Sequence, residues 1–462
     1  MDLIKNTRYE GHPILWNILL YGITRFTLNP FWMQFLHILI STSVVFLFLK
    51  KAPFSLTFKT LFIFGYFMIF EYNLISRNYI LGVFFLFLAC SVFKDRERKI
   101  ILLSIYLTLA ANVHLMFCVI AFAMFLTLQL ENFQNKQLFR KKVIIGSFIF
   151  GVGLLIAIIQ IIPPDDSLFL IRIAKMPLNE KFVKGFVSLF KGLITIPDFR
   201  TIHFWNSNLL VNINKPFAGV LGILVYLIPL LLFFKNKKTL FFVYIALFGA
   251  QVFFFMTQLG ATRYDGMTYL IIIVALWIEN YYTDDTNKLS AFLYSKKLAL
   301  LKKPIIYSIL LIHFTSGVFA YAKDYKDSFT SSKETVDYLK KKRLDRLPII
   351  SVSCEATALS PYLGKKVWFL CSGSFESFCR WNSASKCAAF QTNIIPLITN
   401  FLRTKDSAVF VSSSFKIKNA KPNVWINAND KIKIRFLKKF DNVIIKNMGY
   451  YVYEVAKITV PK

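Results

Sequence analysis

The stretch IILLSIYLTLAANVHLMFCVIAFAMFLTLQL, residues 100–130, decides the fold of this chain. It contains no Asp, Glu, Lys or Arg, and it is longer than the roughly 20 apolar residues that cross a bilayer as one helix. The polar residues of AANVH, at 110–114, offer a break inside it. We therefore predict two apolar helices joined by a short turn, which is typical of a multi-pass membrane protein.

The composition of the whole chain agrees with this interpretation. Of 462 residues, 56% are hydrophobic and 50 are Phe, and the mean hydropathy is +0.52, too apolar for a water-soluble globule of this size. Further apolar stretches of span length lie at 31–49, 56–74, 79–93, 143–162, 217–234, 239–258, 266–282 and 304–322. With the two helices around residue 112, the sequence predicts about ten spans.

The net charge of +31 is arranged as a topology signal. Lys and Arg gather in short loops at alternate ends of consecutive spans, at 50–51, 94–99, 136–142, 235–238 and 288–303. The positive-inside rule assigns these loops to the cytoplasm, which puts outside the segments 1–30, 75–78, 112–114, 163–216, 259–265 and everything after 323. The charge is thereby explained without nucleic acid as a partner. The start of the chain also lacks the pattern of a cleaved signal peptide.

Three regions follow from this topology. Residues 1–30 form part of a first external loop, 31–322 a transmembrane domain with an external loop at 163–216, and 323–462 an extracytoplasmic domain. Within the loop, the spacing of apolar residues over 182–193 predicts an amphipathic helix, which either lies on the outer leaflet or packs on the membrane domain.

The last region has the pattern of a small α/β domain. Short β-branched or aromatic runs at 348–353, 366–372, 407–414 and 441–447 predict strands, and 334–343 and 393–403 predict helices. Four cysteines on the oxidising side favour one or two disulfides, whose pairing stays open: Cys354, Cys371, Cys379 and Cys387. No phosphate loop, metal spacing or nucleophile elbow occurs here, so an accessory role fits this domain best.

Ionisable residues near spans are costly and are therefore candidates for function. Several fall at the predicted outer ends of helices, where one external cavity could collect them: Glu10, His12, Glu71, Arg77, His114, Arg263 and Asp265. Each also has a structural explanation, such as a local ion pair or a helix terminus. Arginine is always charged and matches phosphate in bidentate fashion, so Arg77 and Arg263 suit the phosphate of a lipid carrier. A carboxylate and His12 would position or activate an acceptor hydroxyl.

The motifs YEGHPILWNILL, EYNLISRNYILGVFFLFLA and LAANVHLM, within residues 7–130, resemble those of bacterial multi-pass membrane proteins related to the GT-C glycosyltransferases. ATRYDGMTYLIIIVALWIE at 261–279 and GSFESFCRWN at 373–382 are similar more weakly. The resemblance implies a helical bundle of GT-C type in the bacterial cytoplasmic membrane. It also implies transfer of a sugar from a polyprenyl-phosphate donor to a lipid, glycan or protein acceptor on the outer face.

By position, the resemblance implies a site made of several residues in different roles. It puts Glu10, His12 and Pro13 in the first external loop, and Arg77, Tyr79 and His114 in the walls of the donor cavity. Taken with the ionisable residues above, we expect Glu10 and His12 to be catalytic and Glu71 and Asp265 to be supporting. The expected donor-binding residues are Arg77, Tyr79, His114 and Arg263. The partners implied are the lipid-linked sugar and membrane lipids. No metal ligands are predicted and no cofactor follows from the sequence, although a divalent cation stays compatible with a phosphate donor.

Two departures from the related sequences stand out. In those, a further transmembrane helix and an acidic Asp-Glu motif precede the match, whereas here only MDLIKN does, so we expect a shortened chain that is inactive alone or has lost its base. Arg263 is also followed by Tyr264 and Asp265 where a histidine is expected. Alternatives are a transporter or lipid flippase, a glycan polymerase or ligase, and a structural subunit of an envelope assembly.

Overall fold

The computed structural model describes residues 6–168, 176–257, 261–283, 296–352, 354–379, 381–382, 393–417 and 421–458, with only the backbone at 296–299. The chain forms two compact units. The first, here called the helical unit, comprises Met1–Pro164, Leu170–Phe199 and Asn206–Ala322. The second, here called the sheet unit, comprises Asp165–Phe169, Arg200–Trp205 and Lys323–Lys462. The chain is mainly helical, with a small strand-containing region near its C-terminus.

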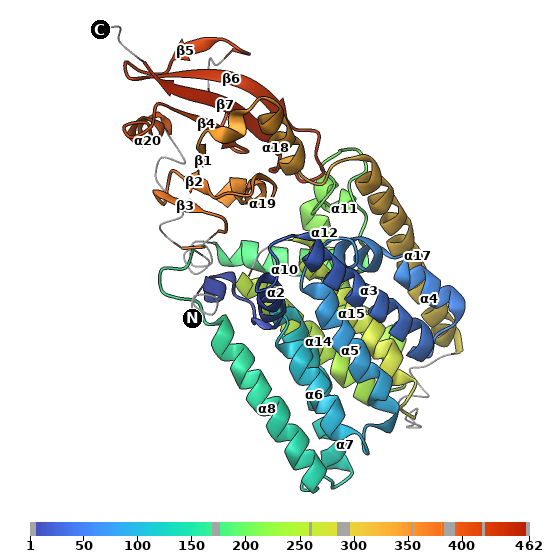
Figure 1. The fold of residues 1–462 in the computed structure, drawn as a ribbon. Helices are drawn as coiled ribbons and strands as arrows, with labels where there is room; N and C mark the ends of the chain where they lie inside the picture. Colours follow the sequence, from blue (N-terminus) through green and yellow to red (C-terminus); the bar gives the residue numbers. More distant parts are fainter. Residues whose placement is uncertain are drawn as a thin grey trace. The chain divides into compact units, whose positions relative to one another are not determined.

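The helical unit is a bundle of apolar helices (Figure 1). They are α2 (Leu15–Thr24), α3 (Phe31–Lys51), α4 (Leu56–Ile63), α5 (Tyr79–Val92), α6 (Ile100–Ala111), α7 (Leu115–Gln134), α8 (Lys141–Ile161), α10 (Leu178–Leu193), α11 (Leu209–Ile213), α12 (Lys215–Leu224), α13 (Ile228–Phe233), α14 (Lys237–Thr257), α15 (Thr262–Glu279) and α17 (Lys296–Lys326). Short helices precede or join them, of which η1 (Arg8–Glu10) and the π-helix η2 (Phe67–Tyr72) matter for the site.

Six helical segments among the described residues are long and apolar enough to cross a membrane: Phe31–Lys51, Leu115–Gln134, Lys141–Ile161, Lys215–Phe233, Lys237–Thr257 and Leu300–Lys326. This supports a membrane protein and bears out part of the expected set of about ten spans. The segment 56–74 is interrupted before η2, α5 and α6 have only 14 and 12 residues, and α15 includes Arg263, Asp265 and Glu279. These segments are apolar enough in sequence, but in the structure their helices are interrupted, are short or include charged residues.

The predicted break inside residues 100–130 is confirmed. Helix α6 ends at Ala111 and α7 begins at Leu115, with His114 as the N-cap residue. The Asn112 side-chain amide donates to the carbonyl oxygens of Thr108 and Gly153, both at 2.9 Å. The polar turn is therefore fixed to α8 as well as to the helix that precedes it.

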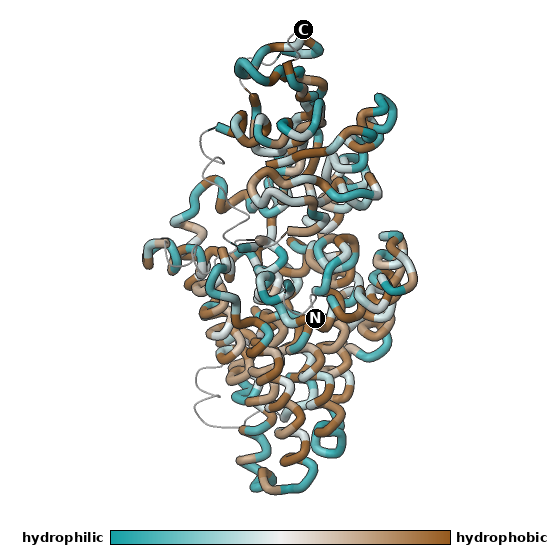
Figure 2. Tube along the Cα trace, turned by 60° about the vertical axis from the view of Figure 1, so that its left-hand side comes forward, coloured by the Kyte–Doolittle hydropathy of each residue, from teal (hydrophilic) through white to brown (hydrophobic). Residues whose placement is uncertain are grey.

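Basic loops meet at one end of the helical unit. Arg96, after α5, contacts Glu131 of α7 at 2.6 Å, and Lys238 of α14 contacts the same carboxylate at 3.0 Å. The Arg96 guanidinium also lies 4.6 Å from the ring centroid of Tyr282, just after α15. The carboxyl ends of α5, α7 and α15 therefore lie together, and their N-termini lie at the other end. Figure 2 shows mainly hydrophobic residues along the long helices and hydrophilic residues at the loops of the end farthest from the C-terminus.

The predicted amphipathic helix is present as α10, and it packs on the bundle. It runs across the direction of α8 and α6 (Figure 1), and its second half is buried. Lys191 forms a buried ion pair with Asp265 of α15 at 2.8 Å. Gly222 of α12 lies so close to α10 that an added Cβ would be 2.0 Å from the backbone oxygen of Phe186. Of the two interpretations of this helix, the contacts favour the packed one.

The sheet unit contains one seven-stranded sheet with the order β3-β2-β1-β4-β7-β6-β5. Its strands are β1 (Ile349–Ser351), β2 (Val367–Phe369), β3 (Ser374–Glu376), β4 (Ser407–Ser412), β5 (Trp425–Asn427), β6 (Ile432–Phe440) and β7 (Tyr450–Lys457). β1 pairs in parallel with β2 and β4, and the other pairings are antiparallel. Helix α18 (Ser332–Lys341) packs with one hydrophobic cluster and α20 (Ile395–Phe401) with the other.

The strands predicted at 348–353, 366–372 and 407–414 are present as β1, β2 and β4, but the strand predicted at 441–447 is wrong. That segment is the connection between β6 and β7. Val443 and Ile444 are buried there without a ladder, and the Ile444 amide donates to the Ser328 carbonyl oxygen at 3.0 Å. Burial of a connecting loop therefore produced the apolar run that looked like a strand.

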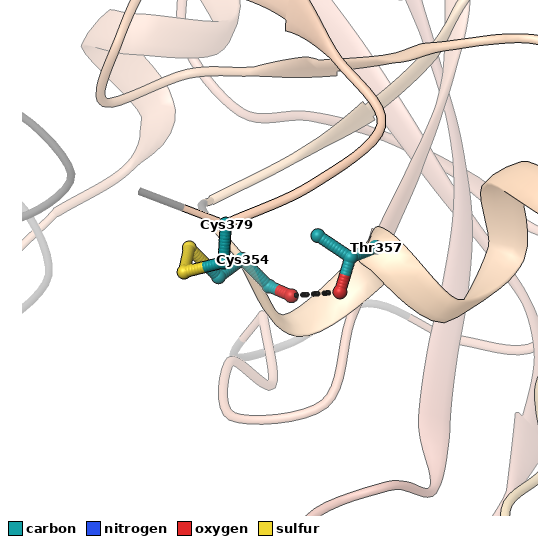
Figure 3. The surroundings of a disulfide bond; sticks show 3 residues. All are labelled: Cys354, Thr357 and Cys379. Atoms are coloured by element: carbon teal, nitrogen blue, oxygen red, sulfur yellow. Dashed lines mark hydrogen bonds between the residues drawn. A yellow bond between two sulfur atoms is a disulfide. The ribbon is translucent and has the colours of Figure 1, made fainter. Parts of the chain in front are cut away.

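A disulfide joins Cys354, after β1, to Cys379, after β3 (Figure 3). The Thr357 hydroxyl donates to the Cys354 carbonyl oxygen at 2.9 Å and fixes the turn that carries this cysteine. The expectation of at least one disulfide is confirmed by this pair, while Cys387 lies outside the described residues. The bond ties the segment after β3 to the centre of the sheet.

Replacing Gly222 with Ala should destabilise the helical unit, because the new methyl group would collide with backbone rather than with a movable side chain. The apparent melting temperature of the detergent-purified chain should fall by several degrees, as measured by scanning fluorimetry. The matched control is Gly151→Ala in α8, where a Cβ would meet nothing within 4 Å. That variant should be neutral or slightly stabilised. Equal behaviour of the two variants would contradict the close packing of α10 on α12.

Candidate functional site

Three helices of the helical unit begin at one place. Arg263, in the first turn of α15, donates through Nε to the hydroxyl of Tyr79, the first residue of α5, at 3.1 Å. The rings of Tyr79 and His114, the N-cap residue of α7, lie 5.1 Å apart, and those of His114 and Tyr264 lie 5.4 Å apart. Because helix N-termini carry partial positive charge and open N–H groups, this meeting point favours an anion.

A segment that precedes all these helices supplies His12. Its ring lies 4.1 Å from that of His114, at an interplanar angle of 35°. Gly11, with φ +66°, makes the left-handed turn before it. The Ile14 amide donates to the Gln160 side chain at 2.9 Å, and the Leu15 amide donates to the Asn112 carbonyl oxygen at 3.4 Å. The turn at 112 and the end of α8 therefore hold the segment in place.

The two histidines present nitrogen atoms that are buried without a protein partner among the described residues. His114 Nδ1 accepts from the Met116 amide at 3.1 Å, so a neutral ring carries its proton on Nε2. That Nε2 and the Nδ1 of His12 have no hydrogen-bond partner. Buried polar atoms are almost always satisfied, so an unsatisfied pair at one place is typical of a site that receives a ligand or ordered water.

Burial, together with the nearby charge of Arg263, lowers the pKa of His12 to about 4. The ring is therefore neutral at pH 7 and can both accept and donate a hydrogen bond. In the loop before α5, burial and the like charge of Arg263 lower the pKa of Arg77. His12 and Arg77 thus sit in the same positive field.

Aromatic hydroxyls and a small residue hold Arg263 in position. The Tyr72 hydroxyl, at the end of η2, donates to the Arg263 carbonyl oxygen at 3.0 Å. This approach requires Gly266, where a Cβ would lie 2.2 Å from that hydroxyl. The Arg263 guanidinium also lies 4.8 Å from the ring centroid of Tyr264.

One buried carboxylate acts on both arginines. Glu71, in η2, accepts from the Tyr66 hydroxyl at 3.1 Å and interacts electrostatically with Arg77 and Arg263. Asp265 also interacts electrostatically with Arg263, but it is paired with Lys191 of α10, whose charge balances its own. Two guanidinium groups against one carboxylate leave net positive charge at the helix N-termini.

The structure brings together His12, Arg77, Tyr79, His114 and Arg263 of the predicted site, with Glu71 beside them. We call these six residues, with Tyr264, the arginine–histidine cluster. Glu10 is exposed, and among the described residues its side chain hydrogen-bonds to Asn17 rather than to either arginine. Asp265 is turned to α10. Sequence reasoning missed Tyr264, although it follows Arg263 directly, and Lys191, for which the sequence offered no signal beyond helical spacing.

Chemically, the cluster can hold an anionic group with two guanidinium groups and helix N-termini, and it offers neutral imidazole nitrogens beside it. Among the described residues, no group of three or more His, Cys, Asp and Glu side chains could hold a metal ion. The chemistry of the described side chains is therefore that of an anion site with hydrogen-bonding bases.

Lowering the pH should destabilise the chain in part through His12. The unfolded chain protonates this ring below about pH 6.5, whereas the native chain does so only near 4. Between these values the unfolded state binds more protons, so native stability falls as the pH falls. His12→Gln should therefore show a smaller drop in apparent melting temperature between pH 7 and pH 5. The wild-type chain under the same conditions is the reference, and an unchanged drop in His12→Gln would contradict a neutral, buried His12.

Comparisons with known proteins add no family to this description. No family model, no curated protein and no solved structure matches the chain.

Proposed function

We propose that this chain is a membrane glycosyltransferase of GT-C type, which moves a sugar from a polyprenyl-phosphate donor to a lipid, glycan or protein acceptor. One observation carries the proposal: Arg263 lies at a partly buried meeting point of three helix N-termini, where it contacts Tyr79 and interacts electrostatically with Arg77. A lipid phosphate can reach such a place with its chain in the bilayer and its charge at the helix ends.

The phosphate oxygens account for the charge of the cluster. An arginine fork binds two oxygens of one phosphate, and partial burial strengthens the attraction because less water screens it. The donor Nε2–H of His114 lies beside the same place and adds a neutral hydrogen bond. The binding of a polyprenyl phosphate would thus satisfy buried atoms that the described protein residues leave unsatisfied.

In the transfer step the acceptor oxygen bonds to the anomeric carbon of the sugar, and the bond from that carbon to the phosphate oxygen breaks. Negative charge then grows on the leaving phosphate, where Arg77 and Arg263 stabilise it more than in the ground state. His12 takes the proton of the acceptor hydroxyl; burial is the main cause of its low pKa, and the bound phosphate offsets the further lowering by the charge of Arg263. Glu10 lies two residues before His12, at the end of η1, and would contact the acceptor.

The proposal includes a place in the cell. Basic loops lie at the end of the helices opposite the cluster, and the positive-inside rule assigns that end to the cytoplasm. The cluster would then face outward from the bacterial cytoplasmic membrane, where lipid-linked sugars are consumed by extracytoplasmic acceptors.

Arg77→Ala should weaken binding of a polyprenyl-phosphate sugar by about 10- to 100-fold, because it removes a charged hydrogen bond to phosphate. Transfer of radiolabelled sugar by the chain in nanodiscs should fall at least as much. Arg25→Ala is the matched control, since Arg25 is an exposed arginine after α2 and should leave both quantities unchanged.

The readouts separate this function from its alternatives. Unchanged binding and turnover in Arg77→Ala would contradict the site. Movement of a labelled lipid across liposomes by the wild-type chain, without any transfer of sugar, would instead identify a transporter or flippase.

A further inference from the structure

A second positively charged site lies at the basic end of the helical unit. It is a cavity of about 450 Å³, which is within the usual range for ligand sites. Three segments line it, the connection between α5 and α6, the end of α7 and the start of α8; the lining residues are Glu97, Arg98, Asn132, Gln137, Arg140, Lys141, Lys142 and Val143. We call it the α7–α8 cavity. The cavity shares no residue with the arginine–histidine cluster.

The lining is strongly cationic. Arg98, Arg140, Lys141 and Lys142 face it against the single carboxylate of Glu97. Arg98 also approaches Asp95 at 3.8 Å, but both side chains are exposed and such a pair is weak. Cations from two of the basic loops therefore line one cavity.

The start of α8 adds backbone donors to this charge. Arg140 is the N-cap residue of this 21-residue helix and makes no capping hydrogen bond with its side chain. Lys141 and Lys142 form the first turn, so their amide groups belong to the open N-terminus of the helix. An anion in the α7–α8 cavity would meet the positive end of the α8 dipole.

Asn132 provides independent evidence for a ligand. It is 6% exposed, it lines the cavity, and its Nδ2 donor has no partner among the described residues. Its backbone oxygen accepts from the Gln137 amide at 2.7 Å, which fixes the turn after α7 and holds the side chain in place. The Asn132 amide group therefore lacks an acceptor among the described residues. An oxygen of a bound anion could accept from it and would also be attracted by the surrounding cations.

Exposed apolar residues near the cavity could contact the acyl chains of a lipid. Phe139, Ile144 and Phe148 are 90%, 52% and 71% exposed, and they lie in sequence directly beside and just beyond the cationic residues. Only 22% of the span window of α8 is buried in the protein, so most of this apolar helix is open to contact with lipid. A headgroup in the cavity can therefore keep its acyl chains along α8.

We propose that the α7–α8 cavity binds the phosphate headgroup of an anionic phospholipid. The cations and the α8 N-terminus hold the phosphate, Asn132 donates to one of its oxygens, and the acyl chains pack on Ile144 and Phe148. This site would bind a lipid of the leaflet at the basic end of the helices. It does not depend on sugar transfer, and it uses none of the residues assigned to that function.

The test is a titration of the full chain with lipids, read by native mass spectrometry in detergent. Phosphatidylglycerol should bind more tightly than phosphatidylcholine. Arg140→Gln/Lys141→Gln should weaken phosphatidylglycerol binding roughly 10- to 30-fold, because each lost charge near a membrane surface is worth about a factor of five. The matched control is Lys50→Gln/Lys51→Gln, which removes the same charge from the end of α3.

Asn132→Leu separates the cavity from general charge, because it removes one donor and no charge. It should lower the affinity several-fold while the control pair keeps wild-type affinity. An equal loss in the control pair, or unchanged binding in both cavity variants, would overturn the proposal. Complete displacement of phosphatidylglycerol by millimolar inorganic phosphate, at constant ionic strength, would show a site for free phosphate and would overturn the lipid assignment.

Discussion

Positive charge that is partly buried at the ends of apolar helices is the constraint on which the site depends. Desolvating a guanidinium group costs several kcal/mol unless nearby groups offset it, and Arg77 and Arg263 raise that cost for each other. Glu71 offsets part of it, and aromatic hydroxyls and rings surround Arg263. The remaining positive charge favours binding of an anion, for which we propose the phosphate of a lipid.

The surrounding structure holds this charge in one place. The π-helix η2 turns both Glu71 and Tyr72 inward, and Gly266 lets the Tyr72 hydroxyl reach the backbone of α15. The break between α6 and α7 puts His114 at a helix start, where its Nδ1 is used as a cap and its Nε2 points elsewhere. The Lys191–Asp265 pair then neutralises the second charge of the α15 first turn and fixes α10 to it. Features that shorten or interrupt the helices are therefore the ones that build the site.

Much of the cluster could be predicted from the sequence because alternation of spans puts every second turn at the same end. This alternation predicts that His12, Arg77, His114 and Arg263 lie at one end of the helices, without any knowledge of packing. It could not separate Asp265 from the site, since its partner Lys191 comes from a distant helix whose orientation depends on packing. Nor could the sequence predict that η2 interrupts the segment 56–74, because a π-turn has no clear hydrophobic period. The strand predicted at 441–447 is wrong because loop residues such as Val443 are buried and therefore apolar.

The central claim is that the arginine–histidine cluster recognises phosphate on a lipid. Its most direct test compares binding of a polyprenyl phosphate with binding of the matching uncharged polyprenol to the wild-type chain in nanodiscs, by isothermal titration calorimetry. Because the two ligands share their apolar chain, their difference isolates the phosphate. The account predicts that the phosphate binds at least about tenfold more tightly, as one or two charged hydrogen bonds require. Equal affinities would contradict it.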